Sequence, residues 1–112
     1  MVINADNAKK IEVLFREHLE RNFQGTGLKF DPIVVEPAYD QFDQKTFDVT
    51  VVFDGDYGLL KPGTLNSIST AMLDEYEAMG IYTTVIDGYV SKEEWDMRDQ
   101  LFLDTWEELN GP

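Results

Sequence analysis

The most regular pattern of apolar and polar positions lies between Thr46 and Val90. Its first part alternates, because every second residue from 47 to 53 is apolar. The segments 54–58 and 62–63 that follow are rich in Asp, Gly and Pro, which form turns, so the strand is predicted to end there. One face of this strand would carry Phe47, Val49, Val51 and Phe53.

An amphipathic helix is predicted after these turns, with Thr64 as its N-cap and Gly80 as the residue that stops it. The β-branched and aromatic run Ile81 to Ile86 then predicts a second strand. If both strands belong to one sheet, the helix makes a right-handed crossover between them and the stretch is a β-α-β unit. The helix has one apolar stripe, formed by Leu65, Ile68, Met72, Tyr76 and Met79.

A first helix is predicted from Asn7 to Phe23, beginning near Asn4 or Asp6 and ended by the segment 25–27. His18, the only histidine, lies in the middle of its apolar face. A catalytic base would need a cleft and an orienting partner, and the sequence supplies neither, so the pattern favours a core or boundary position. The predicted face comprises Ile11, Leu14, Phe15, His18, Leu19 and Asn22.

A short strand from Lys29 to Glu36 is bracketed by Pro32 and Pro37, which suggests the edge of a sheet because proline donates no ladder hydrogen bond. The nine residues 37–45 would connect it to the central strand. Two interpretations of this connection stay open: its aromatic side chains fold back on the core, or they form a contact loop. The contact loop would comprise Tyr39, Asp40, Phe42 and Asp43.

A last helix is predicted to begin at the capping box Ser91 to Glu94. Its buried face would carry Trp95, Phe102, Trp106 and Leu109. The opposite arc has a small apolar centre and an acidic rim, as a partner-binding patch would have, unless the helix packs on two sides. This candidate patch comprises Glu93, Asp96, Met97, Leu101, Asp104, Glu107 and Glu108.

These elements predict an α+β fold, a two-layer α-β-β-α-β-α domain with a three-stranded mixed sheet and helices on one face. Its 112 residues suffice for one domain, 1–112, with a hydrophobic core. If the other face of the sheet is uncovered, it would suit a second copy of the chain as a homo-oligomer.

The charge is the one unusual value of the composition. The formal net charge is −13, made up of +1 for residues 1–29 (five basic, four acidic) and −14 for residues 30–112 (four basic, eighteen acidic). Such a field repels nucleic acid and anionic membranes and attracts basic partners. The chain has no cysteine and no apolar run of membrane-spanning length, so a cytoplasmic protein is expected.

Chemical sites are few in the sequence. Asp54 and Asp56 lie two residues apart and are weak candidates for holding Mg²⁺ or Ca²⁺, but an EF-hand loop starting at Asp54 would require glycine and glutamate where Leu59 and Leu65 stand. The glycines match no phosphate-binding motif, and the serines lack a nucleophile-elbow pattern. No catalytic residue, metal site or cofactor is predicted.

The resulting hypothesis is a non-enzymatic acidic module that binds a basic protein surface, as an inhibitor, an immunity protein or a nucleic-acid mimic does. Direct binding to nucleic acid or membrane is not expected. The alternative is a structural or assembly subunit, either a homo-oligomer or part of a larger particle. A metal-assisted hydrolase using Asp54 and Asp56 is the third and least favoured hypothesis.

Overall fold

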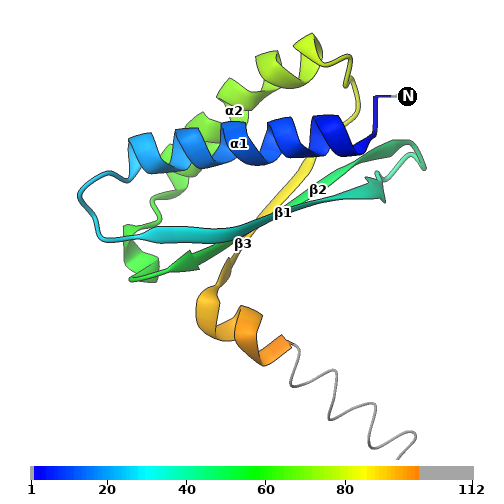
Figure 1. Ribbon diagram of the computed structural model, residues 1–112. Coiled ribbons are helices and arrows are strands. Elements are labelled where there is room, and N and C mark those ends of the chain that lie inside the picture. Colours follow the sequence, from blue (N-terminus) through cyan, green and yellow to red (C-terminus); the bar gives the residue numbers. More distant parts are fainter. Residues whose placement is uncertain (1, 99–112) are drawn as a thin grey trace, which may run out of the picture.

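The computed structural model describes residues 2–98 and has the predicted α+β order (Figure 1). The elements are α1 (Ala5–Asn22), β1 (Lys29–Tyr39), β2 (Lys45–Asp54), the 3-10 turn η1 (Tyr57–Leu59), α2 (Pro62–Ala78) and β3 (Ile86–Ser91). A third helix follows at residues 92–98, and the Ser91 hydroxyl accepts a hydrogen bond from the Glu94 amide, as the capping box predicts. None of the described helices is long and apolar enough to cross a membrane.

The three strands form one mixed sheet in the order β1-β2-β3. β1 and β2 are antiparallel, and β2 and β3 are parallel, so Val51 of β2 lies opposite Ile33 on one side and Tyr89 on the other. β2 is central because it is the most apolar strand: besides its predicted core face, Thr46 and Val52 on the opposite face are also fully buried.

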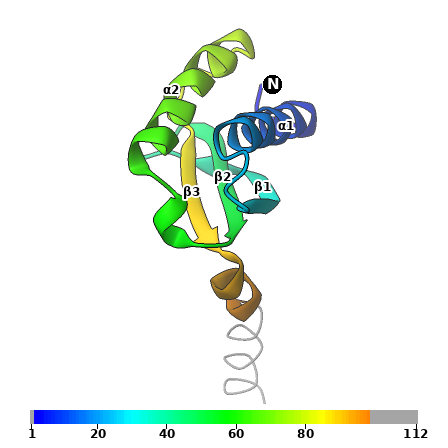
Figure 2. The ribbon, with the colours of Figure 1, turned by 90° about the vertical axis from the view of Figure 1, so that its left-hand side faces the viewer.

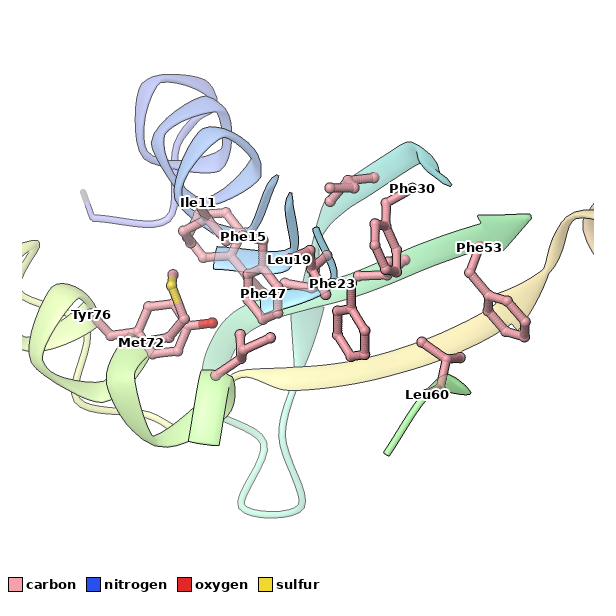
Figure 3. Packing of buried hydrophobic residues seen from close by; sticks show 14 of the residues in the cluster. Ile11, Phe15, Leu19, Phe23, Phe30, Phe47, Phe53, Leu60, Met72 and Tyr76 are labelled. Carbon is pink, nitrogen blue, oxygen red and sulfur yellow. The ribbon is translucent and has the colours of Figure 1, made fainter. Parts of the chain in front are cut away.

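The core lies between the sheet and the two long helices, which cover the same face (Figure 2). Figure 3 shows side chains of α1, β2 and α2 meeting in this layer. The predicted stripes are confirmed through the middle of both helices, whereas Asn22, predicted on the apolar face of the first helix, is exposed because it is the last residue of α1. The fully or almost fully buried members are Ile11, Phe15 and Leu19 of α1, Phe47, Val49, Val51 and Phe53 of β2, and Ile68, Met72 and Tyr76 of α2.

The ends of α1 follow the predicted signals. Asn4 is the N-cap, and its side chain accepts a hydrogen bond from the Asn7 amide at 2.8 Å. Beyond the last turn, Gly25 and Gly27 adopt φ of 80° and 83°, a conformation that stops the helix. Arg16 joins the helix to the edge strand, because its guanidinium donates to the Phe30 carbonyl.

Two predicted boundaries in the β-α-β unit are wrong. The N-cap of α2 is Lys61, not Thr64, because Pro62 has the preset φ of a first helical residue. The strand predicted at Ile81 to Ile86 is a loop as far as residue 85, and β3 begins only at Ile86. The position of β3 is set by its pairing with β2, which overrides the strand propensity of the preceding residues.

The β1–β2 hairpin is longer than predicted. β1 continues through Pro37 to Tyr39, so the turn is confined to residues 40–44. Pro37 is tolerated because β1 is an edge strand, as its two prolines predicted.

Candidate functional site

The turn of the β1–β2 hairpin is held by one carboxylate. Asp40 Oδ1 accepts hydrogen bonds from the Phe42 amide at 2.8 Å and from the Gln44 amide at 3.0 Å. The Asp40 amide in turn donates to the Gln44 carbonyl, and Asp43 takes a φ of 59°, which aspartate tolerates better than most residues. The turn therefore has a defined conformation fixed by local polar contacts.

Two aromatic rings on this hairpin point into solvent. Phe42 is 71% exposed and Tyr39 is 64% exposed, so these side chains do not fold back on the core. Single exposed apolar residues are common on protein surfaces, whereas here two large rings are exposed on one ordered turn.

A third exposed ring is brought to the same end of the molecule by the loop between α2 and β3. The Thr46 hydroxyl, fully buried, donates to the Thr84 carbonyl at 2.9 Å, and the Thr83 hydroxyl donates to the Lys45 carbonyl at 3.2 Å. These two contacts fix the loop against the first residues of β2. Tyr82 in this loop is 81% exposed.

Acidic side chains also lie on the β1–β2 hairpin. Glu36 and Asp48 are direct cross-strand partners, so both point to the sheet face opposite the helices. Like charges in this arrangement destabilise a sheet unless an opposite charge is supplied. The name hairpin end is used below for the three rings and the four acids of residues 36–48: Tyr39, Phe42, Tyr82, Glu36, Asp40, Asp43 and Asp48.

The patch predicted on the last helix is described only in part. Glu93 and Asp96 are exposed, and Met97 is 52% exposed. Lys92 lies 3.0 Å from an Asp96 oxygen and offsets part of the negative charge there. Trp95, predicted to be buried, is half-buried. Leu101, Asp104, Glu107 and Glu108, with Phe102, Trp106 and Leu109 of the opposite face, lie outside the described residues.

The two weak metal candidates, Asp54 and Asp56, lie at the other end of β2. Asp54 is exposed opposite Lys29, and Asp56 Oδ1 accepts a hydrogen bond from the Gly58 amide, which caps η1. No group of three or more potential metal ligands occurs within residues 2–98. His18 is partly buried on α1.

Sequence reasoning found part of the hairpin end and missed the rest. It named Tyr39, Asp40, Phe42 and Asp43 as a contact loop, but it placed Tyr82 in a strand. Glu36 and Asp48 are far apart in the chain and become neighbours only through the strand register. No family model, no curated protein and no solved structure matches this chain.

Proposed function

We propose that this protein is a non-enzymatic acidic module that binds a basic protein surface through the hairpin end. The observation that supports this most is the pair of exposed rings, Phe42 and Tyr39, on a turn whose conformation Asp40 fixes. Large aromatic side chains at the centre of an interface supply much of its binding energy. Because the turn is already ordered, little conformational entropy is lost on binding.

The negative charge of the chain favours a basic partner. Asp43 lies on the same turn as Phe42, Glu36 and Asp48 present carboxylates on the sheet face opposite the helices, and the whole chain carries −13. A basic partner would be attracted over a longer range at low salt and would relieve the repulsion between Glu36 and Asp48. A protein of this kind would block a nucleic-acid-binding site by occupying it. We place this encounter in the cytoplasm, because a chain without cysteine does not depend on an oxidising compartment.

The test starts by capturing partners from an extract of the source cells on the immobilised protein at ~0.05 M and ~0.5 M salt, which shortens the screening length severalfold. The captured partner is then purified and its binding measured with variants. Phe42→Ser combined with Tyr82→Ser should weaken binding by about tenfold or more. The matched control combines Val13→Ser with Leu73→Ser, two exposed apolar residues on the helices.

A second pair of variants tests the role of charge. Glu36→Gln with Asp48→Asn should slow association several-fold at low salt, and the difference should shrink at high salt. Asp74→Asn with Glu77→Gln, both exposed on α2, removes the same charge elsewhere. Glu93→Gln with Asp96→Asn probes the patch predicted on the last helix. Equal effects of the hairpin and α2 pairs would refute the hairpin end as the binding surface, and self-association without a partner would favour an assembly subunit.

A further inference from the structure

The β-α-β unit forms a solvent-open cavity of about 310 Å³ between η1, which follows β2, and the part of β3 that carries Asp87 and Tyr89. Its walls come from η1, from the first two turns of α2 and from β3. The position alone does not define a ligand, but the side chains that line the cavity do.

The polar wall of the cavity is built around Asp87 of β3. The Ser69 hydroxyl of α2 donates to Asp87 Oδ2 at 2.6 Å, which fixes the carboxylate against the helix. Asp87 is the only charged residue in the lining, and no lysine or arginine takes part. It also belongs to none of the ion pairs found among residues 2–98. The cavity therefore holds a negative charge without a cation.

A buried hydroxyl also belongs to the lining of the cavity. The Tyr89 hydroxyl is the one buried side-chain oxygen or nitrogen within residues 2–98 that has no hydrogen-bond partner. Burial raises the pKa of both Tyr89 and Tyr76, and the negative charge of Asp87 raises both further. Charge interactions are stronger where solvent access is reduced, so the partly buried Asp87 would attract a cation more strongly than a fully exposed aspartate does.

The remaining walls of the cavity suit an apolar or aromatic group. Leu60 and Leu65 line it, and the Tyr57 ring at its mouth, whose centroid lies 6.0 Å from that of Phe53, is 76% exposed. Anionic ligands are disfavoured because only Asp87 supplies charge.

We propose that this cavity binds a small primary ammonium compound with an apolar or aromatic body, its ammonium group held by Asp87 and its body against Leu60, Leu65 and Tyr57. The ammonium group would donate to the free lone pairs of the carboxylate, which also accepts from Ser69. This site is separate from the hairpin end and does not depend on the proposed function.

The experiment titrates the ¹⁵N-labelled full chain with 2-phenylethylamine and with 2-phenylethanol, which has the same shape without the charge. Amide shifts should concentrate around Gly58, Asn66, Ser69 and Asp87. We expect the amine to bind about tenfold more tightly than the alcohol, because only the amine pairs with the carboxylate. Asp87→Asn, which can still accept from Ser69, should remove this difference, whereas Asp74→Asn on the exposed side of α2 should preserve it.

Equal binding of the two probes, shifts that map elsewhere, or an unchanged preference in Asp87→Asn would overturn the proposal. The comparison of amine with alcohol on the unmodified protein decides the matter even if the Asp87 variant fails to fold. Absence of shifts with either probe would overturn it as well.

Discussion

Replacing Tyr89 with phenylalanine removes one oxygen atom whose surroundings give it no hydrogen-bond partner. The ring packs against the core from β3 and would keep its contacts, since the two side chains differ only in the hydroxyl. Folding buries this hydroxyl without giving it a hydrogen-bond partner in place of water. Tyr89→Phe is therefore expected to stabilise the protein, although most core substitutions destabilise.

The size of the effect follows from the cost of an unpaired buried polar group, roughly 1–3 kcal/mol in proteins. Taking the lower end of that range, the free energy of unfolding should rise by about 1 kcal/mol. For a chain of this length such a gain corresponds to an increase in Tm of about 4 °C. Tyr57→Phe is the control, because the Tyr57 ring is 76% exposed and its hydroxyl has no comparable desolvation to lose.

The assay is thermal and urea unfolding followed by circular dichroism at pH 7. A lower Tm for Tyr89→Phe than for the unmodified protein would refute the reasoning, because it would show that the hydroxyl makes a favourable contact. The Tyr89 hydroxyl could then no longer be described as an unpaired group in the lining of the cavity.

The same variant also changes the response to alkaline pH. Burial, followed by the charge of Asp87, raises the pKa of Tyr89 and Tyr76 above the ordinary value of 10.0. Above pH 10 the unfolded chain loses these protons while the folded chain keeps them, so the stability they contribute is full below pH 10 and declines as the pH rises through the folded pKa values. Tyr89→Phe should make this decline shallower between pH 9 and 11 in urea titrations. An unchanged slope would argue against the raised pKa.

Three further substitutions test the packing and the turn. Thr46→Val keeps the shape of the side chain but leaves the Thr84 carbonyl without its hydrogen-bond donor. The free energy of unfolding, measured in urea titrations, should fall by about 1 kcal/mol. An unchanged value would show that this contact does not fix the loop. Met72→Ala should lower the free energy of unfolding by about 2–5 kcal/mol because Met72 is fully buried. The control Leu73→Ala, on the exposed side of the helix, should lower it by less than ~1 kcal/mol. Equal losses would contradict the orientation of the helix. Asp40→Ala removes the acceptor of two hydrogen bonds from turn amides. It should lower the free energy of unfolding by about 1 kcal/mol and broaden the amide resonances of residues 40–44. Unchanged spectra would show that the turn does not need the carboxylate.

The fold could be predicted where burial produces a periodic pattern. Phe47, Val49, Val51 and Phe53 alternate because one side of β2 faces the helices, and the stripe through Ile68 of α2 repeats for the same reason. These patterns are local, so the class and order of the elements followed from them.

The boundaries that failed depend on contacts between distant residues. Asp87 and Gly88 are poor strand formers, yet they lie in β3 because Asp87 pairs opposite Val49 and reaches Ser69 of α2. Ile81 is buried under α2 as part of a loop, although its neighbours have strand propensity.

The candidate surface was harder to predict than the fold, because exposure of an aromatic residue leaves no periodic trace. The sequence leaves open whether Phe42 folds back on the core or points outward. The conformation of the turn depends on two hydrogen bonds to Asp40, and no spacing of residues in the sequence specifies them. Tyr82 lies at the hairpin end because its loop is held by the hydrogen bond from Thr46 to the Thr84 carbonyl, between residues 38 positions apart in the chain.

The two prolines of β1 have a consequence for how copies of this protein behave at high concentration. An eleven-residue strand at the edge of a sheet would offer a long row of backbone donors to a neighbouring molecule. Pro32 and Pro37 each lack a backbone N–H, and the register shift between Phe30 and Ile33 also breaks the regular pairing of the strand. A fibril-like ladder cannot run without breaks along β1, so the strand can carry an exposed aromatic turn at its tip while its own edge resists aggregation.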